Sequence, residues 1–293
     1  MTHAPATLSE RLLTDFPDQV PRYMQDNEDI HGHYRAFYSY KENWISLFHL
    51  HNESVNVWNH LIGGFISIVW GLCALYGITI RTLNFADPMD RIMILLHCLA
   101  SAFTFFTSGL YHLHLSHSYE AYNWWGCWDY AGISAQIGGA TVALLYYLFY
   151  CETGLRTMWA TLVLCFSSVG VIGPYFSFWP TAKFRPIRSA IYVASAVVSG
   201  GPVFHFLWLH GWSALPKNGA VELMGLSLSC YLIGVVFYVS RFPESVWPGK
   251  FDLWFASHQI WHSLVVAAVF FHFHVVFGLI EWRHELGVCE SQS

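Results

Sequence analysis

Charged residues are scarce in this chain of 293 residues, because Asp, Glu, Lys and Arg make up only 11% of it. A soluble domain usually contains about 25% charged residues. Hydrophobic residues account for 55% of the chain and aromatic residues for 18%. This composition argues against a soluble globular domain and indicates a chain that folds within a bilayer, either the plasma membrane or an endomembrane.

Basic residues are also few, and the formal net charge is −5. A protein without a basic surface is poorly suited to bind nucleic acid, so we expect no nucleic-acid partner. The start of the chain is polar and lacks the charged-then-apolar order of a secretory leader. We therefore expect the first apolar run to act as its own insertion signal.

Seven apolar runs are long enough to cross a membrane as helices, which requires about 20 mostly apolar residues each. They cover residues 57–79, 92–113, 122–150, 157–179, 189–212, 223–240 and 253–280. The sequence thus predicts an all-α integral membrane protein with seven transmembrane helices. We divide it into an N-terminal arm at 1–56 with short helices near the membrane, a transmembrane domain at 57–280 and a tail at 281–293.

The orientation follows from the basic residues that flank the runs, because cytosolic loops carry an excess of Lys and Arg. With a cytosolic N-terminus, the cytosolic side holds nine basic residues and the opposite side five. The nine are Arg11, Arg22, Arg35, Lys41, Lys183, Arg185, Arg188, Arg241 and Lys250, and the five are Arg81, Arg91, Arg156, Lys217 and Arg283. We predict a cytosolic N-terminus and an extracellular C-terminus, which is opposite to a G-protein-coupled receptor.

Asp129 is the only Asp, Glu, Lys or Arg within the seven runs. A charge in hydrocarbon costs several kcal/mol and normally has a partner and a function. A single charge gives little support to a transporter with a polar path, and without a lysine in any run no retinal Schiff base can form. The helix ends also lack the Asp-Arg-Tyr and Asn-Pro-x-x-Tyr signatures of G-protein-coupled receptors.

Histidines fall into two layers of the predicted bundle. The inner layer, toward the cytosol, holds His60, His112, His258 and His262 together with Asp129, whereas the outer layer holds His97, His205, His210, His272 and His274. Residues four apart share a helix face, so His258 lies beside His262 and Ser108 beside His112. Three imidazoles with one open position are a common catalytic zinc arrangement, and a nearby carboxylate can deprotonate the water. The paired spacing and the lone carboxylate favour the inner layer, but depth alone leaves a metal in the outer layer open.

Four further residues lie at or beyond the ends of the runs. We expect His114 and His117, which follow the second run, to be solvated loop residues. A disulfide between Cys151 and Cys289 requires that both face an oxidising compartment, and the sequence alone does not favour it.

Four long motifs carry a resemblance to a known family. They are "LFHLHNESVNVWNHLIGG", "SGLYHLHLSHS", "WDYAGISAQIGG" and "SRFPESVWPGKFDLWFASHQIWHSLVVAA". The chain resembles the progestin and adipoQ receptor family, the haemolysin-III-related membrane proteins, and within it the adiponectin receptors and the fungal Izh-type zinc-homeostasis proteins. The resemblance implies zinc held by His112, His258 and His262, with Asp129 beside the water of that metal and Ser108 in the same pocket. It also assigns His60 to helix packing.

The resemblance implies a zinc-dependent hydrolase of a fatty-acyl amide, similar to a ceramidase, that acts in lipid and zinc homeostasis signalling. Its partner would be a lipid substrate or fatty acid within the helix bundle. The alternative is a non-enzymatic receptor in which a structural zinc holds the helices while an extracellular protein ligand binds the outer side.

Overall fold

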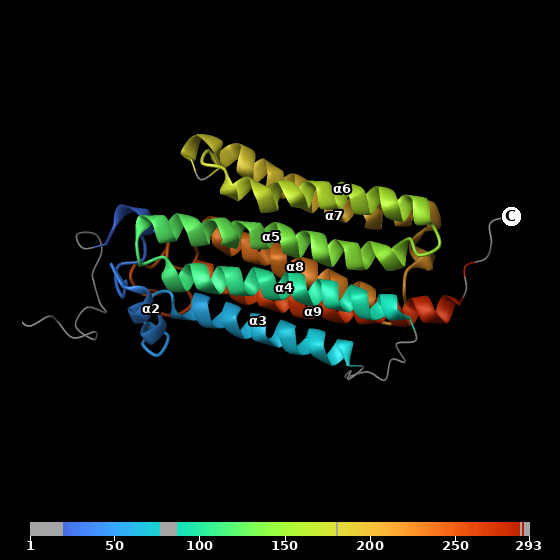
Figure 1. Ribbon diagram of the computed structural model, residues 1–293, viewed down its shortest axis with the longest axis horizontal. Coiled ribbons are helices and arrows are strands. Elements are labelled where there is room, and N and C mark those ends of the chain that lie inside the picture. Colours follow the sequence, from blue (N-terminus) through green and yellow to red (C-terminus); the bar gives the residue numbers. More distant parts are fainter. Residues whose placement is uncertain (1–19, 77–86, 180, 288, 290–293) are drawn as a thin grey trace, which may run out of the picture. The chain divides into compact units, whose positions relative to one another are not determined.

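The computed structural model describes residues 20–76, 87–179, 181–287 and 289, and its regular structure in these ranges is helical (Figure 1). The α-helices are α2 (Tyr40–Ser46), α3 (Ser54–Leu75), α4 (Pro88–His114), α5 (Tyr119–Leu148), α6 (Thr153–Ile172), α7 (Arg185–His210), α8 (Ala220–Ser240) and α9 (Ser257–Leu286). Single 3₁₀ turns occur at η1 (Arg22–Met24), η2 (Gly173–Tyr175), η3 (Ala182–Phe184) and η4 (Trp212–Ala214).

The seven helices from α3 to α9 are long and apolar enough to cross a membrane, which confirms the seven predicted spans. Helices suit this environment because each satisfies its backbone hydrogen bonds internally, without water. The ends differ from the apolar runs by a few residues. Helix α3 begins at Ser54 rather than 57, and α9 begins at Ser257 rather than 253 and continues to Leu286 rather than 280. Polar residues continue these helices beyond the apolar part that hydropathy detects.

Contacts divide the chain into two compact units. Unit 1 contains Met1–Ile62, Phe105–Asp129 and Ser229–Ala267, and unit 2 contains Gly63–Thr104, Tyr130–Leu228 and Ala268–Ser293. Helices α6 and α7 belong wholly to unit 2, whereas α3, α4, α5, α8 and α9 each contribute residues to both units. All the site residues predicted from the sequence, His112, His258, His262, Asp129 and Ser108, fall in unit 1.

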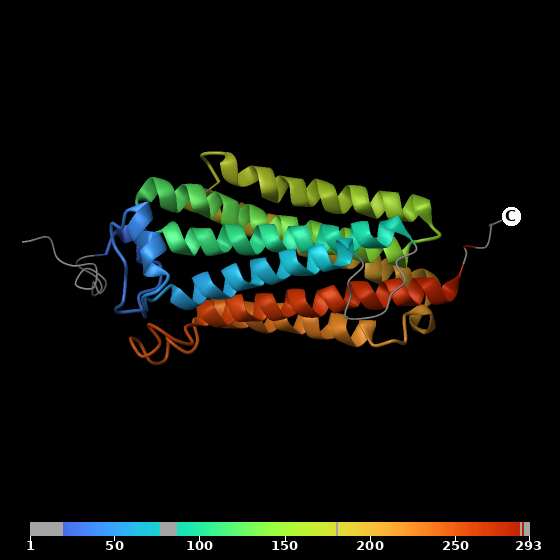
Figure 2. The ribbon, with the colours of Figure 1, turned by 60° about the horizontal axis from the view of Figure 1, so that its bottom comes forward.

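In unit 1 the N-terminal arm lies against the end of α4, as the blue segment in Figure 2 shows. The side chain of Arg35 is 1% exposed. Its Nη2 atom donates to the carbonyl oxygen of His112 at 2.7 Å, and its Nη1 atom donates to the carbonyl of Leu113 at 3.1 Å and to the hydroxyl of Ser46 at 2.8 Å. Carbonyls in the last turn of a helix have no partner within the helix and carry partial negative charge. The arm therefore satisfies the end of α4 with a buried cation.

The arm also binds the segment between α8 and α9. Asn27 donates from Nδ2 to Glu244 at 3.1 Å, and the amide of His31 donates to Asp252 at 3.2 Å. A backbone hydrogen bond of 2.9 Å from Gly249 to the carbonyl of Asp29 adds to these contacts. Unit 1 thus joins the arm to both of the chain segments that carry the predicted histidine ligands.

Unit 2 is packed around aromatic and small side chains. The ring of Trp70 on α3 stacks on that of Phe273 on α9, with 4.1 Å between their centroids. Helices α6 and α7 contact each other, and a Cβ atom at Gly201 on α7 would lie 2.5 Å from the Trp159 ring on α6. A side chain at this glycine would clash, so Gly201 permits close helix packing.

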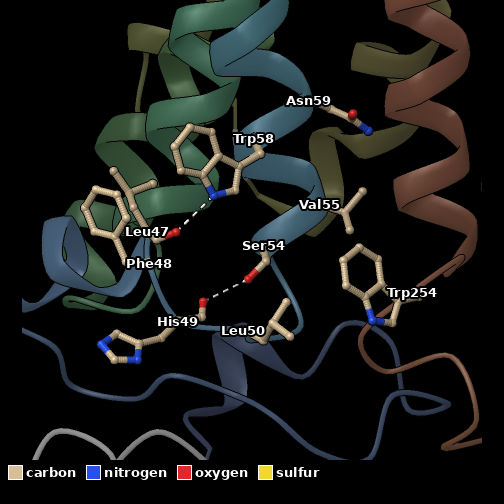
Figure 3. Close-up of a pocket in the computed structure, with 9 residues that line it drawn as sticks. All are labelled: Leu47, Phe48, His49, Leu50, Ser54, Val55, Trp58, Asn59 and Trp254. Carbon is tan, nitrogen blue, oxygen red and sulfur yellow. Dashed lines mark hydrogen bonds between the residues drawn. The ribbon is translucent and has the colours of Figure 1, made fainter.

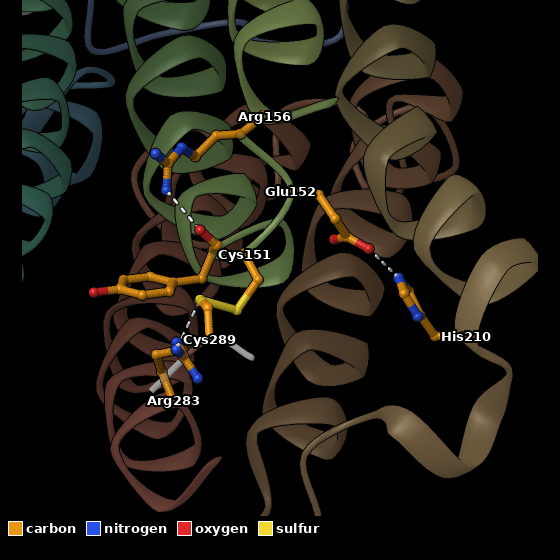
Figure 4. Close-up of a disulfide and its surroundings, with 7 residues drawn as sticks. Cys151, Glu152, Arg156, His210, Arg283 and Cys289 are labelled. Atoms are coloured by element: carbon orange, nitrogen blue, oxygen red, sulfur yellow. Dashed lines mark hydrogen bonds and ion pairs between the residues drawn. A yellow bond between two sulfur atoms is a disulfide. The ribbon is translucent and has the colours of Figure 1, made fainter. Parts of the chain in front are cut away.

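A disulfide joins Cys151, which follows α5, to Cys289 in the tail, with 5.5 Å between their Cα atoms (Figure 4). Arg283 donates from Nη2 to the sulfur of Cys289 at 3.3 Å. Beside the bridge, His210 pairs with Glu152 at 2.7 Å. The pairing that the sequence alone did not favour is therefore present, and it fixes the tail to the turn between α5 and α6.

Candidate functional site

The start of α9 is determined by a buried carboxylate. Glu244 is 0% exposed, and its Oε2 atom accepts a hydrogen bond of 2.7 Å from the amide of Ser257, the first residue of the helix. The hydroxyl of Ser257 donates to Oε1 of the same carboxylate. An anion at a helix N-terminus satisfies free N–H groups and interacts favourably with the helix dipole. Glu244 thereby fixes the helix end that carries His258.

His258 and His262 lie in the first two turns of α9 and face the same way. Their Nε2 atoms are 3.0 Å apart. His262 is buried, with 3% of its surface exposed, whereas His258 is half-buried. Spacing by four residues on one helix face accounts for this arrangement.

His112, in the last turn of α4, completes the cluster. Its Nε2 atom lies 3.3 Å from that of His258, and one nitrogen from each of His112, His258 and His262 lies within 4.8 Å of the other two. Within the described ranges, no other group of three or more His, Cys, Asp or Glu residues comes this close together. The structure thus brings together the three histidines predicted as ligands.

Ser108 and Asp129 lie beside this cluster. Ser108, one turn before His112 on α4, is buried and hydrogen-bonds the half-buried carboxyl group of Asp129 on α5. The charge of Asp129 acts electrostatically on His112. Both residues predicted to accompany the histidines are therefore adjacent to them.

Glu53, which directly precedes α3, is a site residue that the sequence analysis missed. Its Oε2 atom lies 2.7 Å from Nδ1 of His112. Burial raises the pKa of Glu53, but the facing His112 and the Asn56 amide lower it, to a net value of about 2. The carboxylate is therefore ionised at neutral pH and acts only as an acceptor. The only sequence signal was an acidic residue four positions before the first apolar run, in "HNES".

His60, the remaining inner-layer histidine, packs against the cluster. Its ring stacks on that of His262, with 3.9 Å between the centroids and 15° between the planes. The centroid of the Phe105 ring lies 5.2 Å from that of His60. It does not belong to the group of converging nitrogens. The contact agrees with the packing role expected for His60.

The outer-layer histidines are dispersed in unit 2 and have other partners. His205 accepts a hydrogen bond of 3.0 Å from the Trp159 indole, and His272 lies 3.3 Å from the carbonyl oxygen of Ala140. The rings of His97 and His272 are 5.1 Å apart. These histidines do not converge as a set of three, which removes the geometric support for a metal in the outer layer.

The expectation that His114 and His117 are solvated loop residues is wrong. His114 is the last residue of α4 and is 2% exposed, with its ring packed against Tyr40 and Trp44 from α2. His117 is half-buried and its Nδ1 atom lies 2.7 Å from the carbonyl oxygen of Tyr38. The arm covers both residues, and a pattern confined to the second apolar run does not reveal that cover.

A separate pocket of about 340 Å³ opens beside the first turns of α3 (Figure 3). It is lined by Leu47, Phe48, His49, Leu50, Ser54, Val55, Trp58, Asn59 and Trp254. Trp58 donates from Nε1 to the carbonyl of Leu47 at 2.9 Å, and Ser54 donates to that of His49 at 3.2 Å. None of the three clustered histidines lines this pocket, so it is distinct from the candidate metal site.

Seven spans and a cluster of one half-buried and two buried histidines define an integral multi-pass membrane protein with a candidate metal site. A family model described as haemolysin-III related matches residues 48–273. This match covers most of the chain, which belongs to the haemolysin-III-related family, together with adiponectin receptors and other progestin and adipoQ receptor proteins.

Curated relatives come from several kingdoms. The adiponectin receptor protein of Drosophila melanogaster is 29% identical over 276 residues, which cover 92% of this chain and 60% of that protein. ADIPOR-like receptor IZH2 of Saccharomyces cerevisiae is 31% identical over 270 residues, which cover 91% of this chain and 84% of that protein. Heptahelical transmembrane protein 1 of Arabidopsis thaliana is 31% identical over 296 residues, which cover 96% of this chain and 85% of that protein. The chain spans 60% of the Drosophila protein and 58% of progestin and adipoQ receptor-like protein 1 of Caenorhabditis elegans.

The role of Glu244 at the start of α9 leads to a stability prediction. We expect Glu244→Ala to destabilise the protein by about 1–3 kcal/mol, because it leaves the buried amide and hydroxyl of Ser257 without an acceptor. Thermal unfolding of the purified protein in detergent measures this change. Glu42→Ala is the control, since Glu42 also supports a helix start but is only half-buried and makes its hydrogen bonds in an exposed position. A loss of stability in Glu244→Ala no larger than that in Glu42→Ala would contradict the capping role of Glu244.

Proposed function

We propose that the chain is a zinc-dependent hydrolase that cleaves a fatty-acyl amide of a membrane lipid, as a ceramidase does. The convergence of His112, His258 and His262 beside the carboxyl group of Asp129 is the observation that carries this proposal. The likeness to adiponectin receptor and Izh-type proteins supports it at the level of the family.

The histidine cluster fits a zinc ion. Tetrahedral zinc with Zn–N bonds of about 2.0–2.1 Å separates two ligand nitrogens by about 3.3 Å. The Nε2 atoms of His258 lie 3.3 Å from His112 and 3.0 Å from His262. A carboxylate accepts hydrogen bonds, so the contact with Glu53 favours the tautomer of His112 that carries its proton on Nδ1, which would leave the Nε2 lone pair to bind a cation.

Zinc bound there would lower the pKa of a water and polarise the amide carbonyl. Asp129 would act as the general base that accepts a proton from the attacking water, since its carboxyl group lies beside Ser108 and interacts electrostatically with His112. The Ser108 hydroxyl donates to this carboxyl group and would hold its orientation.

The proposed zinc site leads to a prediction about metal content. Purified protein should hold about one zinc per chain, and His258→Ala or His262→Ala should lose it, because each removes one of three ligands. Elemental analysis of the protein in detergent measures the content. His274→Ala is the matched control, since His274 lies on the same helix and contacts the carbonyl of Phe270 rather than the cluster. Full zinc retention in both ligand variants would refute the site.

The second prediction concerns catalysis. Asp129→Asn should keep its zinc but lose at least about 100-fold in turnover, the usual contribution of a general base. Release of fatty acid from a ceramide by the purified protein measures turnover. Asp87→Asn is the control, because Asp87 belongs to unit 2 and its carboxylate accepts from the nearby Met89 amide. Unchanged turnover in Asp129→Asn would rule out this role.

The names of the relatives favour a second candidate function. Several are called receptors, and a receptor could use the zinc only to hold helices while an extracellular protein ligand binds. In that case wild-type protein would contain zinc without cleaving ceramide, and Asp129→Asn would leave ligand binding intact. The turnover assay therefore separates the two functions.

We also propose the orientation with a cytosolic N-terminus. The nine-to-five distribution of basic residues supports it, and so does the disulfide, because disulfides persist in oxidising compartments and this one ties down the C-terminal tail. In this orientation the histidine cluster lies toward the cytosolic side.

This orientation predicts the state of the cysteines in protein taken from cells. Denatured but unreduced protein should take up an alkylating reagent at five cysteines, and at all seven after reduction, because Cys151 and Cys289 are paired. Mass spectrometry counts the added groups. The variant Cys151→Ser should show six modified cysteines both without and with reduction, because Cys289 then has no partner. Seven modified cysteines without reduction would place the tail in a reducing compartment and overturn the orientation.

A further inference from the structure

Glu53 and His112 form a buried carboxylate–imidazole pair at the edge of the candidate zinc site. Their Oε2 and Nδ1 atoms are 2.7 Å apart, and the side chains are 18% and 5% exposed, respectively. Among the described residues, His112 is the only one of the three clustered histidines with a carboxylate oxygen at this distance. The opposite ring nitrogen of His112 faces His258.

We propose that Glu53 is a positioning residue for the metal, which holds His112 in the tautomer and ring orientation that present Nε2 to a zinc ion. The inference rests on the proposed zinc site. A carboxylate on the far nitrogen of a metal-bound histidine fixes the tautomer and raises the basicity of the ligand atom. Glu53 comes from the arm, and its hydrogen bond to the cluster is the one with His112, so it would orient that ligand directly, while its charge also acts on His258.

The neighbours of Glu53 hold its side chain in this position. Asn56 donates from Nδ2 to the same Oε2 atom at 2.6 Å. The backbone amide of Glu53 donates to Nδ1 of His51 at 3.1 Å, and the amide of His51 donates to Ser54 at 2.9 Å. His51, Ser54 and Asn56 are all buried. The carboxylate is thus oriented before any metal binds, which lowers the entropy cost of fixing the ligand.

A competing explanation is that Glu53 only supports the start of α3 through Asn56. That role would change stability but leave the tautomer of His112, and therefore zinc affinity, unaffected. The two explanations differ in metal binding rather than in activity, so zinc affinity is the deciding measurement.

The experiment compares zinc affinities of the full-length protein in detergent by competition with a chromophoric chelator. Glu53→Met keeps the length of the side chain but removes the acceptor, and we expect zinc to bind about 10- to 100-fold more weakly. Glu53→Gln retains an acceptor oxygen without the charge, so this variant should lose less zinc affinity than Glu53→Met. The matched control is Glu42→Met, which removes a carboxylate at the start of α2 that accepts hydrogen bonds from the amide and hydroxyl of Ser39.

Thermal unfolding of the zinc-free proteins measures the structural contribution separately. Without zinc we expect Glu53→Met to unfold at a lower midpoint temperature than Glu42→Met, because it leaves the buried Asn56 amide without its acceptor. Zinc should also raise the midpoint of Glu53→Met by less than that of Glu42→Met. If Glu53→Met does not fold, Glu53→Ala takes its place, and the partial recovery by Glu53→Gln still tests the acceptor.

The outcomes separate this inference from the proposed function. Zinc affinity in Glu53→Met or Glu53→Ala equal to that of wild type overturns the positioning role alone. Wild-type protein that binds zinc but does not cleave ceramide overturns the hydrolase and leaves the role of Glu53 testable. Wild-type protein that binds no zinc overturns both.

Discussion

A bilayer core provides no water to polar groups, and this constraint governs both the helices and the site of this protein. Backbone groups are satisfied within seven long helices. Polar side chains within the spans must instead find partners in the protein. In unit 1 they do so by gathering: Ser108 binds Asp129, His60 stacks on His262, and the three histidines converge. A group of polar atoms that excludes bulk water is also an environment in which electrostatic contacts are strong.

The arm supplies the polar partners that the spans lack. Arg35 binds the backbone at His112, Glu53 binds the ring of the same residue, and Asn27 binds the carboxylate that caps α9. Placing such polar residues in hydrocarbon costs free energy, whereas the membrane surface accommodates them. The geometry of the candidate site therefore depends on a segment outside the spans as much as on the helices that carry the histidines.

Hydropathy alone identified the seven spans, because a run of about 20 apolar residues without charge has few other uses. The His258–His262 pair followed from helical spacing, and His112 and Asp129 followed from depth together with family resemblance. Glu53 could not be found in this way, because the arm contains several acidic residues and only the fold shows which one meets His112. The Cys151–Cys289 bridge was equally hidden, since it spans 138 residues of sequence. Helix ends shifted where polar caps such as Glu244 decide them.

The disulfide has a consequence for the covalent structure of the chain. Closing Cys151 on Cys289 makes the polypeptide a ring that contains α6, α7, α8 and α9, including the helix with His258 and His262. A protease that cuts one of the connections between these helices would open the ring without releasing a fragment. The severed pieces would stay attached through sulfur until the bond is reduced, so a nicked molecule keeps all its spans in one covalent unit.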